Sequence, residues 1–160
     1  MNLLLYAPEY RPNTSSMIRS AEFFGFERIY IYDQNGLLKP PINKKERAHM
    51  EHMARVWTAG AIHHIEIVHL DDPLAWLRAY PGRRVGTLVR ETADRLNAFQ
   101  WQADDLILFG SEKNGLPPDV VALLDAAVYI PSLGHTDCLN VAVSFGVVVQ
   151  RAVSALREKP

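Results

Sequence analysis

The sequence predicts an α/β fold in which helices cover both faces of a parallel sheet. Short apolar runs that are typical of buried strands alternate with longer segments of helical periodicity along the 160 residues. Such alternation favours parallel strands that are joined by crossover helices. Because no internal repeat, low-complexity stretch or flexible linker divides the sequence, we expect one domain over residues 1–160.

Glycine, proline and aspartate residues set the boundaries of the expected elements. Gly25 follows the first predicted helix, Asp72 and Pro73 suit the cap and first position of the third, and Pro40 and Pro41 mark a loop. The predicted strands are 2–7, 28–32, 65–70, 84–89, 105–109 and 127–130. The predicted helices are 16–24, 44–58, 72–79, 117–124 and 139–156.

Composition and charge narrow the class of protein. The chain has 17 Lys and Arg against 18 Asp and Glu, which counts against a strong electrostatic binder of nucleic acid unless a local patch supplies the charge. Cys138 is the only cysteine, so an internal disulfide is excluded, and we expect a cytoplasmic protein with no membrane segment. The six histidines show no metal-ligand spacing, and we assign His63 and His64 to a surface strand.

Three regions that follow predicted strands are the candidate binding region, because ligands of parallel sheets bind beyond the carboxyl ends of the strands. They are residues 8–15, 110–116 and 131–138. Asn13 precedes a helix that carries Arg19, Glu112 stands between two glycines, and Asn140 interrupts an apolar helix start. Each also fits a purely structural interpretation: a helix cap followed by a surface arginine, a tight turn with a solvated carboxylate, and an early helix residue.

Taken together, the three regions resemble the SpoU/TrmH family of SPOUT RNA ribose 2′-O-methyltransferases. The family's first motif reads N-x-G-x-x-x-R, its second is a strand followed by G-x-E-x-x-G-L, and its third is I-P, a variable loop and S-L-N before a helix. The matching residues are, in that order, Asn13 and Arg19; Gly110, Glu112, Gly115 and Leu116; and Ile130, Pro131, Leu139 and Asn140. The order and spacing agree over essentially the whole chain.

Two positions depart from the family pattern. Ser15 stands where the first motif has glycine, which bears on a loop conformation with positive φ or on close approach of RNA. Cys138 stands where the third motif has serine, and a thiol is a weaker hydrogen-bond donor than a hydroxyl.

The resemblance implies a C-terminal deep trefoil knot and S-adenosylmethionine as the cofactor, bound in a bent form within the knot. Carried over by position, the cofactor-binding residues are Thr87, Leu88, Gly110, Ile130, Cys138 and Leu139. Adenine needs apolar walls and a few backbone hydrogen bonds, and a glycine at position 110 is expected to let the main chain come close to the ligand. No metal ion is required.

The resemblance also implies four catalytic residues: Arg19, Asn13, Glu112 and Asn140. The ribose hydroxyl must lie in line with the methyl group and must lose its proton. Since a guanidinium keeps its proton at physiological pH, we expect Arg19 to stabilise the developing alkoxide and grip the adjacent phosphate. Asn13 and Asn140 would orient reacting groups, and Glu112 would hold Arg19 or a group of the RNA.

RNA and a second copy of the chain are the partners that the resemblance implies. Basic residues cluster around the predicted helix 44–58, and Arg11 and Arg19 extend the set; the cluster is Lys39, Lys44, Lys45, Arg47 and Arg55. The short chain favours tRNA over rRNA. The apolar final helix is either a core helix or a contact of the homodimer; its valines include Val141, Val143, Val147 and Val148.

Two other interpretations stay open at this point. A module that keeps the fold but only binds RNA or protein, without catalysis, is suggested by Ser15 and Cys138. A small α/β nucleotide-binding regulator outside this family is the other. The first would bind S-adenosylmethionine without transferring its methyl group, and the second would not bind it.

Overall fold

A computed structural model of the chain describes residues 1–89 and 93–157. Its strands form one seven-stranded sheet in the order β3-β2-β1-β6-β4-β7-β5, and all neighbouring strands run parallel. The strands are β1 (Asn2–Tyr6), β2 (Arg28–Tyr32), β3 (Glu66–His69), β4 (Arg84–Thr87), β5 (Asp94–Arg95), β6 (Leu106–Phe109) and β7 (Ala126–Tyr129). The predicted parallel α/β sheet is confirmed.

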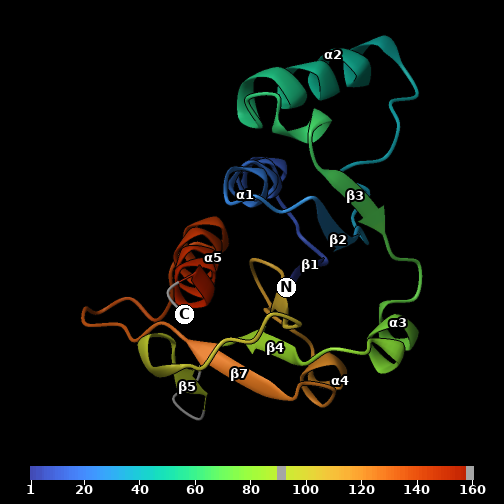
Figure 1. Ribbon diagram of the computed structural model, residues 1–160. Coiled ribbons are helices and arrows are strands. Elements are labelled where there is room, and N and C mark those ends of the chain that lie inside the picture. The colour runs from blue at the N-terminus through green and yellow to red at the C-terminus, as the bar shows by residue number, and fades with distance from the viewer. Residues whose placement is uncertain (90–92, 158–160) are drawn as a thin grey trace.

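Helices lie on both sides of this sheet. Figure 1 shows α1 and α5 on one side, α3 and α4 on the other, and α2 beyond α1. The α-helices are α1 (Arg11–Phe23), α2 (Lys44–His52), α3 (Pro73–Ala79), α4 (Pro118–Val121) and α5 (Val141–Arg157). Shorter helical segments are the π-helix η1 (Met53–Trp57) and the 3₁₀ helices η2 (Ala61–His63) and η3 (Leu96–Ala98).

The central strands are buried on both faces. In β1, Leu3 and Leu5 belong to the core beneath α1 and α5, whereas Leu4 and Tyr6 belong to the core beneath α3 and α4. β6 alternates in the same way, with all four of its residues buried. Burial of successive side chains in opposite cores fixes the register of both strands. The loops that leave their carboxyl ends therefore start from a rigid base.

The first helix begins earlier than predicted. We expected it over 16–24, but α1 begins at Arg11, with Tyr10 as the N-cap and Pro12 in the first turn. Proline suits that turn because its missing N–H would have no partner there and its φ is already helical. Asn13 accordingly lies inside the helix rather than in the loop before it, and Ser15 has a helical backbone.

Other differences concern short elements. The assignment of His63 and His64 to a strand is wrong, because His63 ends η2, His64 is its C-cap and β3 begins at Glu66. The helix expected over 117–124 covers only four residues as α4, and β5 and η3 were not predicted. By contrast, Asp72 caps α3 as expected, accepting the backbone N–H of Ala75 at 2.9 Å. The trefoil knot stays a prediction.

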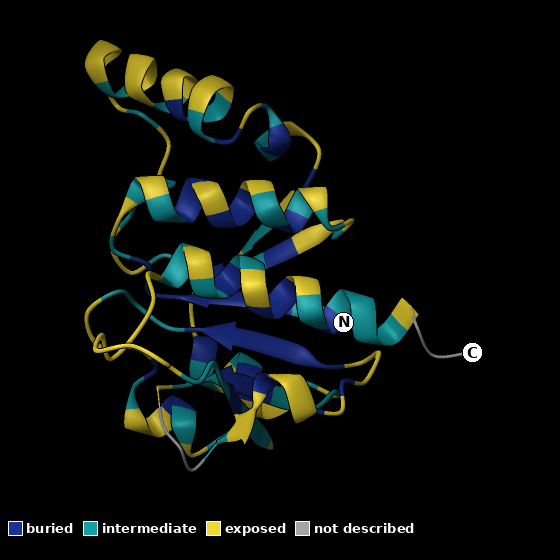
Figure 2. Ribbon diagram, turned by 90° about the vertical axis from the view of Figure 1, so that its left-hand side faces the viewer, coloured by how far each residue is buried: buried dark blue, intermediate teal, exposed yellow. Residues whose placement is uncertain are grey.

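We call α2 and η1 together, residues 44–57, the outer helix. Figure 2 shows α2 as an exposed layer beyond α1, and none of the α2 residues is buried. Its start is held by reciprocal bonds, since the Asn43 side chain accepts the Glu46 backbone N–H at 2.9 Å and donates its amide to the Glu46 carboxylate at 2.7 Å. Met53 of η1 is fully buried and anchors the segment to the body.

The ion pair between Arg83 and Asp105 anchors the amino-terminal edge of β4 and β6, and its loss should destabilise the fold. Asp105 is fully buried and accepts from Arg83 at 2.7 and 2.9 Å. Asp105→Ala should lower the free energy of unfolding by about 2–4 kcal/mol, because it leaves the partly buried guanidinium without its carboxylate. Urea denaturation measures the change. Glu66→Ala, which breaks the exposed Arg28 pair, is the control, and an equal loss in both variants would contradict the account.

Candidate functional site

A tight turn after β6 places Glu112. Ser111 and Gly115 exchange two backbone hydrogen bonds of 3.0 Å, and Gly115 has a φ of 65°. Gly110 packs so closely on this turn that a Cβ would lie 2.1 Å from the carbonyl carbon of Gly115. Gly110 is therefore needed for the turn itself, and the close approach of its main chain to a ligand stays a prediction.

The Glu112 carboxylate joins the turn after β6 to the loop after β1. One oxygen accepts the backbone N–H of Glu9 at 2.7 Å. The other accepts the backbone N–H of Tyr10 at 3.2 Å and the side-chain amide of Asn13 at 3.0 Å. The start of α1 is thus tied to the turn after β6 by three hydrogen bonds to one charged group.

Asn140 completes this arrangement from the start of α5. Its Oδ1 accepts the backbone N–H of Ala142 at 2.9 Å, as a helix cap does, and its Nδ2 donates to Oδ1 of Asn13 at 3.2 Å. Residues 13, 112 and 140, far apart in the chain, are therefore linked side chain to side chain. We call Asn13, Glu112 and Asn140 the polar network. The structure brings together three of the four residues that the motifs singled out for catalysis.

Arg19 lies apart from the polar network. Six residues of α-helix separate it from Asn13, which corresponds to about 9 Å along the axis and about 120° around it. Its side chain lines a hollow of about 490 Å³ between α1 and α5, together with Phe23, Gly146 and Val147. Within residues 1–89 and 93–157, no hydrogen bond or ion pair joins Arg19 to the polar network.

The expected cofactor-binding residues follow three neighbouring strands. Thr87 and Leu88 follow or end β4, Gly110 follows β6 and Ile130 follows β7, and these strands are adjacent in the sheet. The Thr87 hydroxyl donates to the carbonyl of Leu108 at 2.9 Å and the Leu88 N–H donates to the carbonyl of Val128 at 2.9 Å. Both groups are engaged in holding the strand ends together.

Apolar side chains around this edge remain partly uncovered, which fits an adenine ring. Leu88 and Ile130 are half-buried, and Leu139 is 47% exposed. Cys138 is exposed in the loop before α5. Leu88 packs against the core beneath α3 and α4, and Ile130 packs against the core beneath α1 and α5. Apolar side chains therefore border this edge from both faces of the sheet, as a flat aromatic ligand between them would require.

The residues expected to contact RNA form two groups. Lys44, Lys45 and Arg47 are exposed on the outer helix. Arg11 is in the first turn of α1, and its Nε donates to the carbonyl of Leu37 at 2.9 Å. Arg11 therefore belongs to the neighbourhood of the polar network rather than to the outer helix.

Tyr10 and Lys113 are residues of this region that the sequence did not single out. The Lys113 ammonium lies 3.0 Å from the Glu9 carboxylate and 5.9 Å from the centre of the Tyr10 ring. The ion pair raises the pKa of Lys113 and lowers the pKa of Glu9, so both stay charged at neutral pH. The signal in the sequence was an aromatic residue within a polar loop that follows a strand.

Residues 1–150 match the model of the SpoU rRNA Methylase family. The chain belongs to the SpoU family. It is 29% identical over 154 residues to the tRNA (cytidine(34)-2'-O)-methyltransferase of Escherichia coli (strain K12), covering 95% of this chain and 91% of that protein. It is 28% identical over 144 residues to the 23S rRNA (guanosine-2'-O-)-methyltransferase of Acinetobacter baylyi, covering 88% of this chain and 54% of that protein.

A solved structure described as "Structural insights into the 2-OH methylation of C/U34 on tRNA" superposes with a TM-score of 0.77 and 29% identity, covering 98% of this chain and 90% of that one. Membership of the SpoU family confirms three predictions: the family itself, the activity of a methyltransferase and S-adenosylmethionine as the methyl donor. The α/β nucleotide-binding regulator is thereby excluded.

Replacing the charge of Glu112 should weaken this SpoU-family site without destroying the fold. Glu112→Gln puts an amide N–H where a donor now points, so at least one of the three bonds is lost. We expect the free energy of unfolding to fall by about 1–3 kcal/mol and the rate of methyl transfer to decrease. Thermal unfolding and a transfer assay on the same samples measure both. The matched control is Glu27→Gln at an exposed position, and equal behaviour of the two variants would refute the role of Glu112.

Proposed function

We propose that this SpoU-family methyltransferase methylates a ribose 2′-hydroxyl of tRNA, at nucleotide 34 of the anticodon. The polar network is the observation that carries the proposal, because it places amide groups of two motifs beside the strand ends. Nearly full mutual coverage with the two similar proteins named for position 34 supports the choice of tRNA. The chain spans only about half of the rRNA-modifying relative.

S-adenosylmethionine supplies the methyl group on a sulfonium centre. We infer that Leu88, Ile130 and Leu139 cover its adenine, and that backbone groups beyond β4, β6 and β7 hold it. The partly exposed apolar surface of these residues supports the assignment. Cys138, in the loop before α5, would contribute its backbone, since a thiol is a weak donor.

The polar network supplies donors rather than a base. Both oxygens of Glu112 already accept hydrogen bonds, so its carboxylate positions Asn13 and the loop after β1. Asn13 donates one amide N–H to Glu112, and Asn140 donates one to Asn13. Each amide has two N–H bonds, so one remains on Asn13 and one on Asn140. These two N–H groups would bind oxygens of the ribose and its phosphate and hold the hydroxyl in line.

Arg19 would stabilise the alkoxide that develops on the ribose and grip the adjacent phosphate in a bidentate manner. Because Arg19 faces the hollow between α1 and α5, we propose that Arg19 acts in catalysis only within a homodimer. Exposed apolar residues surround this face, with Phe23 at 78%, Val143 at 52% and Val147 at 41% exposure. A second copy that covers this face would place the partner's Arg19 next to the polar network.

The final helix then serves both of the purposes considered for it. Val148 is buried in the core with Phe145 and Val149, whereas Val143 and Val147 project to the outside. Val141 is half-buried. Gly146 has no atom within 4 Å of the place where a Cβ would lie, which keeps the hollow between α1 and α5 open.

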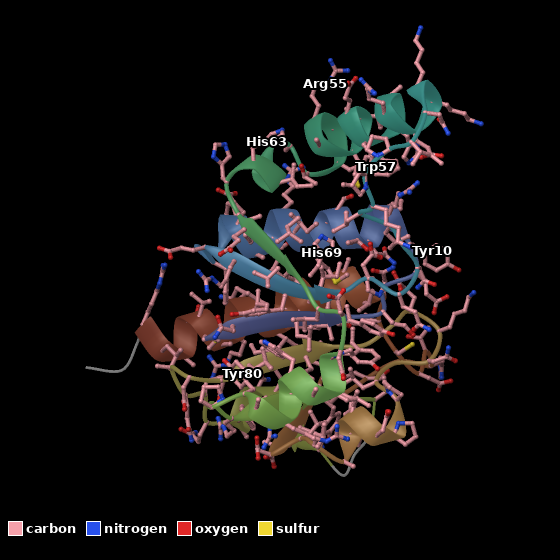
Figure 3. All side chains as sticks on the ribbon, turned by 90° about the vertical axis from the view of Figure 1, so that its right-hand side faces the viewer. Tyr10, Arg55, Trp57, His63, His69 and Tyr80 are labelled. Atoms are coloured by element: carbon pink, nitrogen blue, oxygen red, sulfur yellow. The ribbon has the colours of Figure 1, made fainter. Side chains whose placement is uncertain are left out.

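RNA contact would combine the outer helix with the edge of the polar network. Lys44, Lys45, Arg47 and Arg55 are all exposed on the outer helix, and Figure 3 shows Arg55 on this projecting segment. Arg11 and the nearby Lys39 would extend the contact toward the site. A dimer doubles this positive surface, which offsets the near-zero net charge of the chain.

Residues 1–160 would act as one catalytic domain in the cytoplasm, where tRNA is modified. Within the described ranges, none of the helices is both long and apolar enough to cross a membrane.

The Ser15 departure does not disturb the backbone, since Ser15 is helical and fully buried.

Arg19 variants test the proposed chemistry. With S-adenosylmethionine carrying a labelled methyl group and unmodified tRNA, Arg19→Ala should lower kcat/KM by at least about 100-fold, the loss typical of removing a donor to a developing oxyanion. Arg19→Lys should recover only part of this, because lysine lacks the bidentate fork. Arg78→Ala, an exposed arginine of α3 on the opposite face of the sheet, is the control. Unchanged activity in Arg19→Ala would overturn the assignment.

A charged substitution on the α1–α5 face tests whether this face is the dimer interface. Val147→Glu should convert a dimer into a monomer, since two carboxylates would be buried near each other across the interface. Light scattering coupled to size exclusion measures the mass, and methyl transfer should fall with the loss of the dimer. Ala79→Glu, at an exposed position of α3, is the matched control. A wild-type chain that is a monomer at assay concentration would contradict the proposal.

A further inference from the structure

Tyr10 is an aromatic residue that is exposed although its backbone is fixed. Its side chain is 48% exposed. Its backbone N–H donates to Glu112 at 3.2 Å, and its carbonyl accepts the backbone N–H of Thr14 at 3.0 Å and the Thr14 hydroxyl at 3.1 Å. The main chain is held from both directions, so the ring projects from a fixed point of the backbone without being covered by the core.

Tyr10 is hydrogen-bonded directly to the polar network through its backbone. The same Glu112 oxygen that accepts from Tyr10 also accepts from the Asn13 amide. Tyr10 caps α1, and Asn13 lies in the first turn of that helix. Figure 3 shows Tyr10 at the end of α1, at the edge of the molecule to which the loop beyond β6 also extends. An aromatic ring therefore stands beside the groups proposed to hold the ribose.

One cation lies over the face of the ring, and a second follows Tyr10 in the chain. The Lys113 ammonium is 5.9 Å from the ring centre and is held there by Glu9. Arg11 follows Tyr10 directly, and its Nε is fixed by the carbonyl of Leu37. The loop that presents this carbonyl is itself rigid, because the Asp33 carboxylate accepts the backbone N–H groups of Leu37 and Leu38 at 2.7 and 2.8 Å.

A structural role accounts for the backbone of Tyr10 but not for its side chain. N-cap positions favour serine, threonine, aspartate and asparagine, and Tyr10 makes no side-chain cap bond. An exposed ring with cationic residues nearby is the arrangement with which proteins bind unpaired nucleotides, stacking the base and pairing the phosphates with cations.

We propose that Tyr10 is the stacking platform for an unpaired base of the RNA substrate, at or next to the methylated nucleotide, with Lys113 and Arg11 facing its phosphates. The proposal rests on the proposed function and names how that site selects its substrate. Stacking tolerates any base, so Tyr10 selects for an unpaired, splayed nucleotide over a paired one. Tyr10 is in this sense a specificity residue, and the chemical step belongs to the polar network and Arg19.

The test is a set of substitutions at Tyr10, assayed for methyl transfer to an anticodon stem-loop RNA. Tyr10→Leu should raise KM about tenfold with little change in kcat, because the leucine offers no π-face for the base. Tyr10→Phe should restore the wild-type KM, since the ring stacks without its hydroxyl. Thermal unfolding should be unchanged in both, which separates stacking from a structural role of the side chain.

A second set of measurements locates the base. Stem-loop RNAs with a single abasic nucleotide at, before or after the methylated position are bound to the wild-type and Tyr10→Leu proteins, and Kd is measured by fluorescence anisotropy. At the stacked position the abasic change should weaken wild-type binding about tenfold and leave Tyr10→Leu binding unaffected. Equal effects of each abasic change on both proteins, or a wild-type KM in Tyr10→Leu, would overturn the proposal. Absence of methyl transfer by the wild-type protein would instead refute the proposed function.

Discussion

One carboxylate, that of Glu112, holds the proposed site together. β1 and β6 are neighbours in register, with Leu5 opposite Phe109, so the loops that leave them emerge side by side. Glu112 bonds both backbone N–H groups just before α1 and the Asn13 amide. The positive end of the α1 dipole favours a negative charge at this place. The start of a 13-residue helix is therefore locked to the turn after β6, and Asn140 joins through Asn13.

The sequence predicted the sheet and the meeting of three motifs because both follow from local patterns. Alternating apolar runs indicate parallel strands, and the carboxyl ends of such strands share one edge. The start of α1 was missed because Pro12 reads as a break, whereas proline is well suited to a first helical turn. β5 has two residues, too few for any periodicity. Arg19 was expected beside Asn13 because Asn13 was placed in the loop before the helix. Once both residues lie in α1, their spacing of six residues turns them to different sides of the helix.

The chemistry assigned to each residue follows from which of its polar atoms are already in use. Both oxygens of Glu112 accept hydrogen bonds from the loop after β1 and from Asn13, so Glu112 positions other groups, whereas Asn13 and Asn140 each keep one N–H. The hydroxyl of Thr87 donates to a strand carbonyl, and we propose that backbone groups bind the methyl donor. Gly110 serves the tight turn. A near-neutral chain can still bind RNA when its cations stand on one projecting helix and beside the site.

The central claim is that this chain methylates a ribose of tRNA at the anticodon. The direct measurement is mass mapping of ribose methylation in tRNA from cells that lack the protein, with and without the wild-type gene restored. The account predicts that one 2′-O-methyl group at nucleotide 34 is missing and returns with the gene. An unchanged tRNA methylation map, with a methyl group missing from rRNA instead, would contradict it.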